Sequence, residues 1–150
     1  MKMLRYMMVG AVLLLGVTGM SAKRVQVPQV YMFGFVTSFS DSVVYLTAVQ
    51  EVKGAWIDSK TKFLLGRDNY SYQLKEHFAN QLQQPGRVCT IFFSTAKKDI
   101  EKKLEKLKKR YTSAPKTKKT KRNRPAAYEV RYLSAADFSF EPVDMSPQEE

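Results

Sequence analysis

The side chains best suited to catalysis or metal binding occur once each, since His77 is the sole histidine and Cys89 the sole cysteine. Their closeness in the chain allows a cysteine–histidine nucleophile pair, in which the ring would take the thiol proton. That chemistry needs an exposed thiol, whereas Cys89 lies inside the apolar run Val88–Phe93. A metal site needs several convergent ligands, which one histidine and one cysteine do not supply. We therefore expect structural roles for both residues, with no catalytic residue and no metal.

Sequence motifs of common enzyme classes are missing as well. The chain has no G-x-S-x-G elbow, no glycine-rich phosphate loop and no H-E-x-x-H pair. The sequence thus favours a non-enzymatic protein without a cofactor over an enzyme. If the protein is a small enzyme, Arg67, Asp68 and Tyr70 are the first candidates, because the start of a helix favours bound anions.

One basic segment dominates the charge distribution. Residues 97–124 contain 14 Lys or Arg and three acidic residues, and their net charge of +11 equals that of the whole chain. The pattern has two interpretations that stay open, a solvated helix face with a soluble loop or a surface for an anionic partner. The candidate anion-binding residues are Lys102, Lys103, Lys106, Lys109, Arg110, Lys116, Lys118, Lys119, Lys121, Arg122 and Arg124.

The first 22 residues have the layout of a secretory signal peptide. Lys2 and Arg5 precede an apolar run of 11 residues, Met7–Val17, and small residues follow up to Ala22. A permanent membrane-spanning helix needs roughly 20 apolar residues, so a cleaved signal is favoured. We expect cleavage after Ala22, while cleavage after Ser21 or no cleavage stays open. This layout predicts an exported protein.

The expected location narrows the class of partner. Anionic lipid or an acidic envelope polymer fits both export and the positive charge. Nucleic acid would respond to the same charges, but Tyr111 is the only aromatic residue interleaved with them for base stacking. A protein partner that adds to a strand edge, at residues 127–133, is a further alternative.

Two helices and four strands account for most of the mature chain. Aromatic and β-branched residues predict strands over 30–39 and 43–52, with a turn at residues 40–42. A helix capped by Asp68 follows, with Tyr70, Leu74, Phe78 and Leu82 on one face, and Pro85-Gly86 ends it. The apolar run 88–93 predicts a central strand. Residues 53–67 predict either a short helical turn begun by Asp58 or a third strand at 62–65.

The basic residues lie on the second helix and on the loop after it. Ile100, Leu104, Leu107 and Tyr111 recur at helical spacing and predict a helix over about 96–111. Residues 112–126 have almost no apolar side chain and predict a basic mobile loop. Alternation over 127–133 predicts an edge strand with Tyr128, Val130 and Tyr132 on one face. Phe138 and Phe140 are expected to pack on the body, and 141–150 to form an acidic disordered tail.

The element order is therefore β-β-α-β-α-β in a single domain over residues 23–140. The simplest architecture is an α+β two-layer sandwich, with two helices on one face of a mixed four-stranded sheet.

As a whole, the chain resembles the uncharacterised small exported proteins of Bacteroidetes. The resemblance is carried by the signal layout and by the stretches V-Y-M-F-G-F-V-T-S-F-S-D-S-V-V-Y and F-L-L-G-R-D-N-Y-S-Y-Q-L. It implies a periplasmic location and no particular activity.

Overall fold

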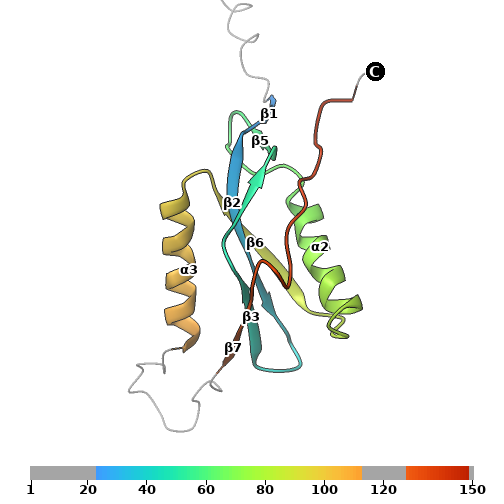
Figure 1. Cartoon of the computed structure of the whole chain (residues 1–150), viewed down its shortest axis with the longest axis vertical. Helices are drawn as coiled ribbons and strands as arrows, with labels where there is room; N and C mark the ends of the chain where they lie inside the picture. The colour runs from blue at the N-terminus through green and yellow to red at the C-terminus, as the bar shows by residue number, and fades with distance from the viewer. Residues whose placement is uncertain (1–22, 113–127, 149–150) are drawn as a thin grey trace, which may run out of the picture.

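The computed structural model describes residues 23–112 and 128–148 (Figure 1). The expected signal peptide lies outside these residues, as does the expected loop 112–126 except for Thr112, the last residue of a helix. Figure 1 shows an elongated molecule in which the sheet stands between two helices. The α+β class predicted from the sequence is confirmed for the described residues.

The main sheet has five strands, and the long strand β2 lies at its centre. One edge of β2 pairs with β6, and the other edge pairs with β4 and β3 in turn, all antiparallel. β7 then adds to β3 in parallel. The bounds are β2 (Gln29–Thr37), β3 (Val43–Thr47), β4 (Gln50–Lys53), β6 (Val88–Ser94) and β7 (Glu129–Leu133). The expected count of four was wrong, because the predicted strand 43–52 is divided after Thr47.

The central strand is β2 and not β6, which corrects the prediction for residues 88–93. Within the described residues β6 pairs only with β2, and it is mostly half-buried. In β2, by contrast, Val30, Met32 and Val36 join one hydrophobic cluster, while Tyr31 and Phe33 join another. Alternate residues of a strand point to opposite faces, so β2 is the strand that is covered on both sides.

The two helices lie on opposite faces of the sheet, so the expected two-layer arrangement was wrong. Tyr70, Leu74 and Phe78 of α2 (Arg67–Asn80) belong to the first cluster. Ile100 and Leu104 of α3 (Lys97–Thr112) belong to the second. The connections β4–α2–β6 and β6–α3–β7 each join parallel strands but cross the sheet in opposite directions. Crossovers of one hand that run in opposite directions must use opposite faces.

The first turn of α2 differs from the prediction. Gly66 occupies the N-cap position with a left-handed φ of 72° and no side-chain cap bond, while Asp68 lies exposed in the first turn. Only glycine adopts this φ without strain, which explains the entry into the helix. The apolar stripe of α2 is confirmed, and Leu82 packs partly buried beyond its end.

A small second sheet covers one end of the core. It pairs β1 (Arg24–Gln26) with β5 (Trp56–Asp58), and an isolated bridge joins Ile57 to Leu64. The Asp58 carboxylate accepts bonds from the N–H groups of Lys60 and Thr61, 2.8 Å each. Residues 56–65 therefore form a hairpin with an Asp-stabilised turn. Neither the predicted helical turn nor the alternative strand at 62–65 forms, since in that stretch Leu64 alone makes an isolated bridge.

The C-terminal segment contacts the body as far as Met145, whereas the sequence predicted a disordered tail from residue 141. We call residues 138–145 the C-terminal strap. Phe138 and Phe140 are buried, as expected. Beyond them the Glu141 backbone is bonded to the Gln73 side chain in both directions, and the Val143 N–H donates to the Tyr70 hydroxyl at 3.0 Å. Figure 1 shows the strap running between α2 and the sheet.

Candidate anion-binding surface

Helix α3 presents the predicted basic residues to solvent. Ile100 is fully buried and Leu104 is 9% exposed, and both pack with Phe33 and Leu46 of the sheet. A helix that packs on the core through one apolar face exposes its opposite face to solvent. Five of the predicted anion-binding residues are exposed on that helix, namely Lys102, Lys103, Lys106, Lys109 and Arg110. The other six lie outside the described residues: Lys116, Lys118, Lys119, Lys121, Arg122 and Arg124.

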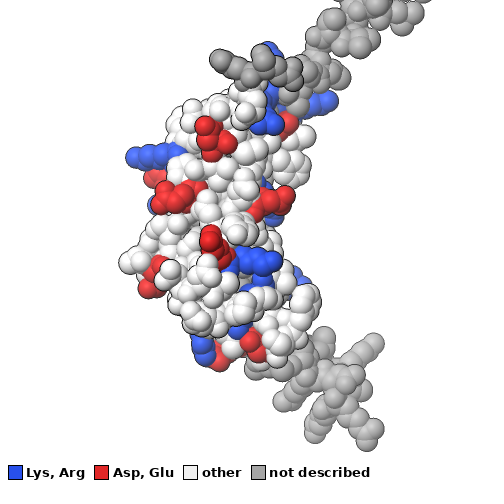
Figure 2. All heavy atoms as spheres, turned by 90° about the vertical axis from the view of Figure 1, so that its right-hand side faces the viewer, with Lys and Arg blue, Asp and Glu red and all other residues white. Residues whose placement is uncertain are grey.

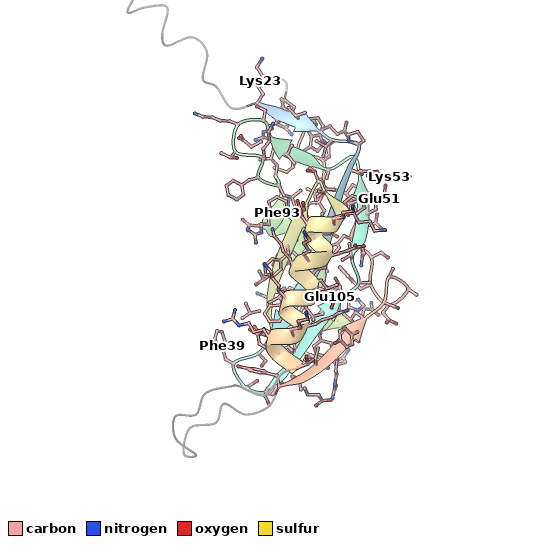
Figure 3. The ribbon with its side chains drawn as sticks, turned by 90° about the vertical axis from the view of Figure 1, so that its left-hand side faces the viewer. Lys23, Phe39, Glu51, Lys53, Phe93 and Glu105 are labelled. Carbon is pink, nitrogen blue, oxygen red and sulfur yellow. The ribbon has the colours of Figure 1, made fainter. Side chains whose placement is uncertain are left out.

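The outward face of α3 is open to solvent. It is lined by Lys98, Glu101, Lys102, Glu105, Lys106 and Lys109. Figure 3 shows this side of the molecule, with Glu105 on the helix. Glu101 pairs with Lys97 at 4.0 Å and Glu105 pairs with Lys108 at 3.3 Å. Both ion pairs use lysines other than the five described candidates, which form no ion pair within the described chain.

Within residues 23–112 and 128–148, the opposite face of the molecule has no comparable surface. Figure 2 shows the side of α2, where acidic and basic side chains are interspersed among uncharged ones. Opposite charges that lie close together largely cancel each other's field, and salt screens what remains beyond about 10 Å at 0.1 M ionic strength. Among the described residues, a predominantly basic surface is therefore found on the side of α3 and not on the side of α2.

Aromatic residues that the sequence interpretation did not join to the basic segment lie beside the end of α3. Tyr111 packs edge-on against Tyr128, with ring centroids 4.9 Å apart, and against Phe35 at 5.0 Å. The Lys108 ammonium lies 5.4 Å from the centre of the Tyr132 ring. Tyr128 and Tyr132 are 46% and 56% exposed. Their shared face was visible in the alternation of the strand, but its position beside α3 required the strand order.

A buried arginine ties the β2–β3 turn to the loop before β6. Arg87 is 8% exposed and donates to the Asp41 carboxylate at 2.8 Å, the Val43 carbonyl at 3.1 Å and the Gln84 amide oxygen at 2.8 Å. Its guanidinium also lies over the Tyr45 ring. Asp41 accepts the Val43 N–H, which is the turn chemistry expected from the sequence. All these partners belong to the fold, so the cluster braces the hairpin.

His77 and Cys89 are not brought together into a catalytic pair. The His77 ring packs against Phe138 at 5.1 Å, and its buried Nε2 has no hydrogen-bond partner within the described residues. Cys89 lies on β6, and burial raises the pKa of its thiol to about 11. A protonated thiol is a poor nucleophile and a poor metal ligand. Within the described residues no group of three or more His, Cys, Asp or Glu side chains could hold a metal ion.

The three residues named for an alternative enzyme site point to different surroundings. The Arg67 guanidinium donates twice to the Ile91 carbonyl, at 2.7 and 3.1 Å. Tyr70 is fully buried, its hydroxyl accepts the Val143 N–H, and burial raises its pKa. Asp68 is exposed. Arg67 and Tyr70 serve the packing of α2, and the set forms no common site.

The outer edge of β7 is open within the described part of the chain. β7 pairs only with β3, from Val43↔Glu129 to Thr47↔Leu133. Glu129 and Arg131 form an exposed ion pair at 2.8 Å on this strand. An unpaired edge offers backbone groups to another strand. The structure thus leaves the strand-edge alternative available.

The described fold and its surfaces define a small α/β/α-layered domain with one strongly basic helix. Comparison of the chain with family models, with curated proteins and with solved structures found no match. No helix among the described residues has both the length and the apolar character to cross a membrane.

Proposed function

We propose that this protein is an exported, non-enzymatic binding or structural module of the cell envelope that uses α3 to contact an anionic partner. Export rests on the layout of residues 1–22, and the periplasmic location rests on the resemblance to exported proteins of Bacteroidetes. The partner is anionic lipid or an acidic envelope polymer.

The packing of α3 against the sheet is the observation that supports this proposal most strongly. Because Ile100 and Leu104 are buried in the sheet, the helix cannot rotate its lysines away from solvent. Lys102, Lys106 and Lys109 recur at spacings of four and three residues, so they form a row along the helix. In the sequence, six further basic residues follow α3 before Pro125 and add to the same charge. Each Lys or Arg near an anionic surface contributes about 1 kcal/mol of binding free energy.

A charge-neutralised variant tests the proposal. Lys102, Lys103, Lys106, Lys109 and Arg110 are replaced by Gln, and binding to anionic vesicles and to an acidic polymer is measured across a salt series. We expect the variant to bind at least about a hundredfold more weakly than the wild type at low salt. The matched control replaces five lysines elsewhere: Lys23, Lys53, Lys60, Lys62 and Lys75. If the two variants lost the same binding affinity, α3 would have no specific role in binding the anionic partner.

The open edge of β7 favours a second candidate function, a module that binds a protein partner through an added strand. The observation is that β7 pairs only with β3 within the described residues. Replacing Val130 with proline would block an added strand at this edge. Loss of a protein partner in this variant, with vesicle binding intact, would support this candidate over the first.

A further inference from the structure

The turn between β2 and β3 contains a phenylalanine, Phe39, whose side chain is not packed into the core. Phe39 is 97% exposed, the highest value among the large hydrophobic residues described. The turn around it is held locally, since the Ser40 N–H donates to the Ser38 hydroxyl at 3.1 Å and the Val43 N–H donates to Asp41 at 3.0 Å. Full exposure of one Phe side chain forgoes roughly 1.5–3 kcal/mol of burial. The Phe39 ring is thus displayed at the tip of a braced turn.

Phe39 lies at the same end of the molecule as the C-terminus of α3. The Glu129 N–H donates to the Ser42 carbonyl at 3.0 Å, which joins the start of β7 to this turn. Tyr111 in the last turn of α3 contacts Phe35 of β2 and Tyr128 before β7. Figure 3 shows Phe39 at this end and Lys23 at the other. We call this region, with Phe39, Lys109, Arg110, Tyr128 and Tyr132, the hairpin end.

The charge of the hairpin end is positive because its acidic residues are already paired. Asp41 pairs with Arg87 at 2.8 Å, and Glu129 pairs with Arg131 at 2.8 Å. Further up the helix, Glu105 pairs with Lys108. Lys109 and Arg110 are exposed and have no acidic partner within the described residues. An approaching surface therefore meets two uncompensated cations beside an apolar tip.

We propose that the hairpin end docks on an anionic lipid bilayer, with the Phe39 ring inserted between the acyl chains and Lys109 and Arg110 among the lipid phosphates. This inference rests on the proposed function and selects its partner. Apolar burial and attraction to anionic lipids together determine the strength of interfacial binding. Tyr128 and Tyr132 suit the same boundary, because a tyrosine ring has an apolar body and a polar tip. An acidic polymer in water offers Phe39 no apolar phase, so the exposed ring favours lipid.

Two tryptophan positions report directly on this geometry. The native Trp56 lies in β5, beyond the end of β2 that is opposite to Phe39. Because β2 has nine residues, its length separates Trp56 from Phe39 by roughly 30 Å. The test uses the chain from Lys23 onward, because both hydrophobic clusters lie within residues 27–143. One form keeps Trp56, and the other, which we call the tip reporter, carries Phe39→Trp with Trp56→Phe. Emission and quenching by brominated lipid are recorded with phosphatidylglycerol and with phosphatidylcholine vesicles.

We expect the emission of the tip reporter to shift to the blue and to be quenched with phosphatidylglycerol vesicles, while the emission of Trp56 in the other form stays unchanged. Phe39→Ser is expected to bind these vesicles about tenfold more weakly, in line with partial burial of one ring. Phe63→Ser is the matched control, because Phe63 is 59% exposed near the β1–β5 sheet. Its affinity should equal that of the wild type.

Each other outcome overturns a defined part of the proposal. Salt-sensitive vesicle binding with an unquenched tip reporter and an unaffected Phe39→Ser variant removes the insertion of the tip and leaves the proposed function standing. Binding to polyglutamate or another acidic polymer but not to vesicles replaces lipid with a polymer partner. Failure to bind any anion at low salt removes the proposed function together with this inference.

Discussion

Gly34 of β2 and Leu74 of α2 are in such close contact that a β-carbon at residue 34 would overlap the Leu74 Cδ2 methyl group. The same hypothetical β-carbon would lie 3.3 Å from Thr47 Cγ2, and the Gly34 N–H donates to the Thr47 hydroxyl at 2.8 Å. Helix α2 can approach the central strand at this point only because residue 34 has no side chain. A glycine inside a strand indicates either a bulge or the close approach of another group. In this structure the Leu74 side chain makes that close approach to Gly34.

The contact predicts a specific coupling between two substitutions. Gly34→Ala should lower the free energy of unfolding by about 1–3 kcal/mol through overpacking. Leu74→Ala should lower it by about 2–5 kcal/mol through the cavity it leaves. In the Leu74→Ala background the added methyl has room, so Gly34→Ala should cost little. Urea denaturation of the four proteins measures this cycle, and equal costs of Gly34→Ala in both backgrounds would contradict the contact.

The bonds of Arg87 predict that it stabilises the hairpin end far more than Arg131 does. Arg87→Gln leaves the Val43 carbonyl without its donor and Asp41 without its cation, at a cost of about 2–3 kcal/mol. Arg131 lies over the same Tyr45 ring, but its side chain is 50% exposed and its partner Glu129 59%. Arg131→Gln should therefore cost at most about 1 kcal/mol. Thermal unfolding of both variants gives the comparison, and similar costs would contradict it.

The C-terminal strap should loosen when a single glutamine is replaced. Gln50 is 8% exposed, its amide nitrogen donates to the Phe138 carbonyl, and its amide oxygen accepts the Phe140 N–H, both at 2.8 Å. Gln50→Met keeps the size and removes both bonds. We expect hydrogen exchange at the Phe140 amide to rise at least about tenfold, as for the loss of about 1.4 kcal/mol of local stability. Gln73→Met is the control, because the bonds of Gln73 to the Glu141 backbone are exposed. This substitution should change hydrogen exchange at the Glu141 amide and leave the Phe140 amide protected. Unchanged protection at Phe140 would show that the two phenylalanines alone hold the strap.

The Cys89 thiol should react slowly at neutral and mildly alkaline pH. Burial raises its pKa to about 11 from an ordinary value of 9.0, so the reactive thiolate is scarce until the pH approaches 11. At pH 8 the thiolate fraction is roughly a hundredfold lower than in the unfolded chain, because the two pKa values differ by about two. Alkylation by iodoacetamide, with and without urea, measures the ratio. Rapid alkylation of the folded protein at pH 8 would show an exposed thiol and reopen a chemical role for Cys89.

The sequence predicted the elements well where their pattern was local. The stripes Tyr70–Leu74–Phe78 and Ile100–Leu104 follow from helical spacing alone, and both are buried. The exposed lysines of α3 follow from the same periodicity, so the described half of the candidate surface was predictable. The cap of α2 was not, because the choice between Gly66 and Asp68 depends on the backbone direction at which the chain enters the helix.

The sequence by itself determined the α+β class, the two helices with a strand between them and one after them, and the concentration of positive charge on one helix and the residues after it. It did not show β1 and β5, and it joined β3 and β4 into one strand. Periodicity and charge are properties of neighbouring residues, so they can be read without the fold. Only the tertiary structure decided that β2 and not β6 is central, and that the helices take opposite faces. It also placed Phe39 and the exposed tyrosines at the same end as Lys109 and Arg110. These relationships depend on strand order and on packing between residues far apart in the chain, about which local patterns carry no information.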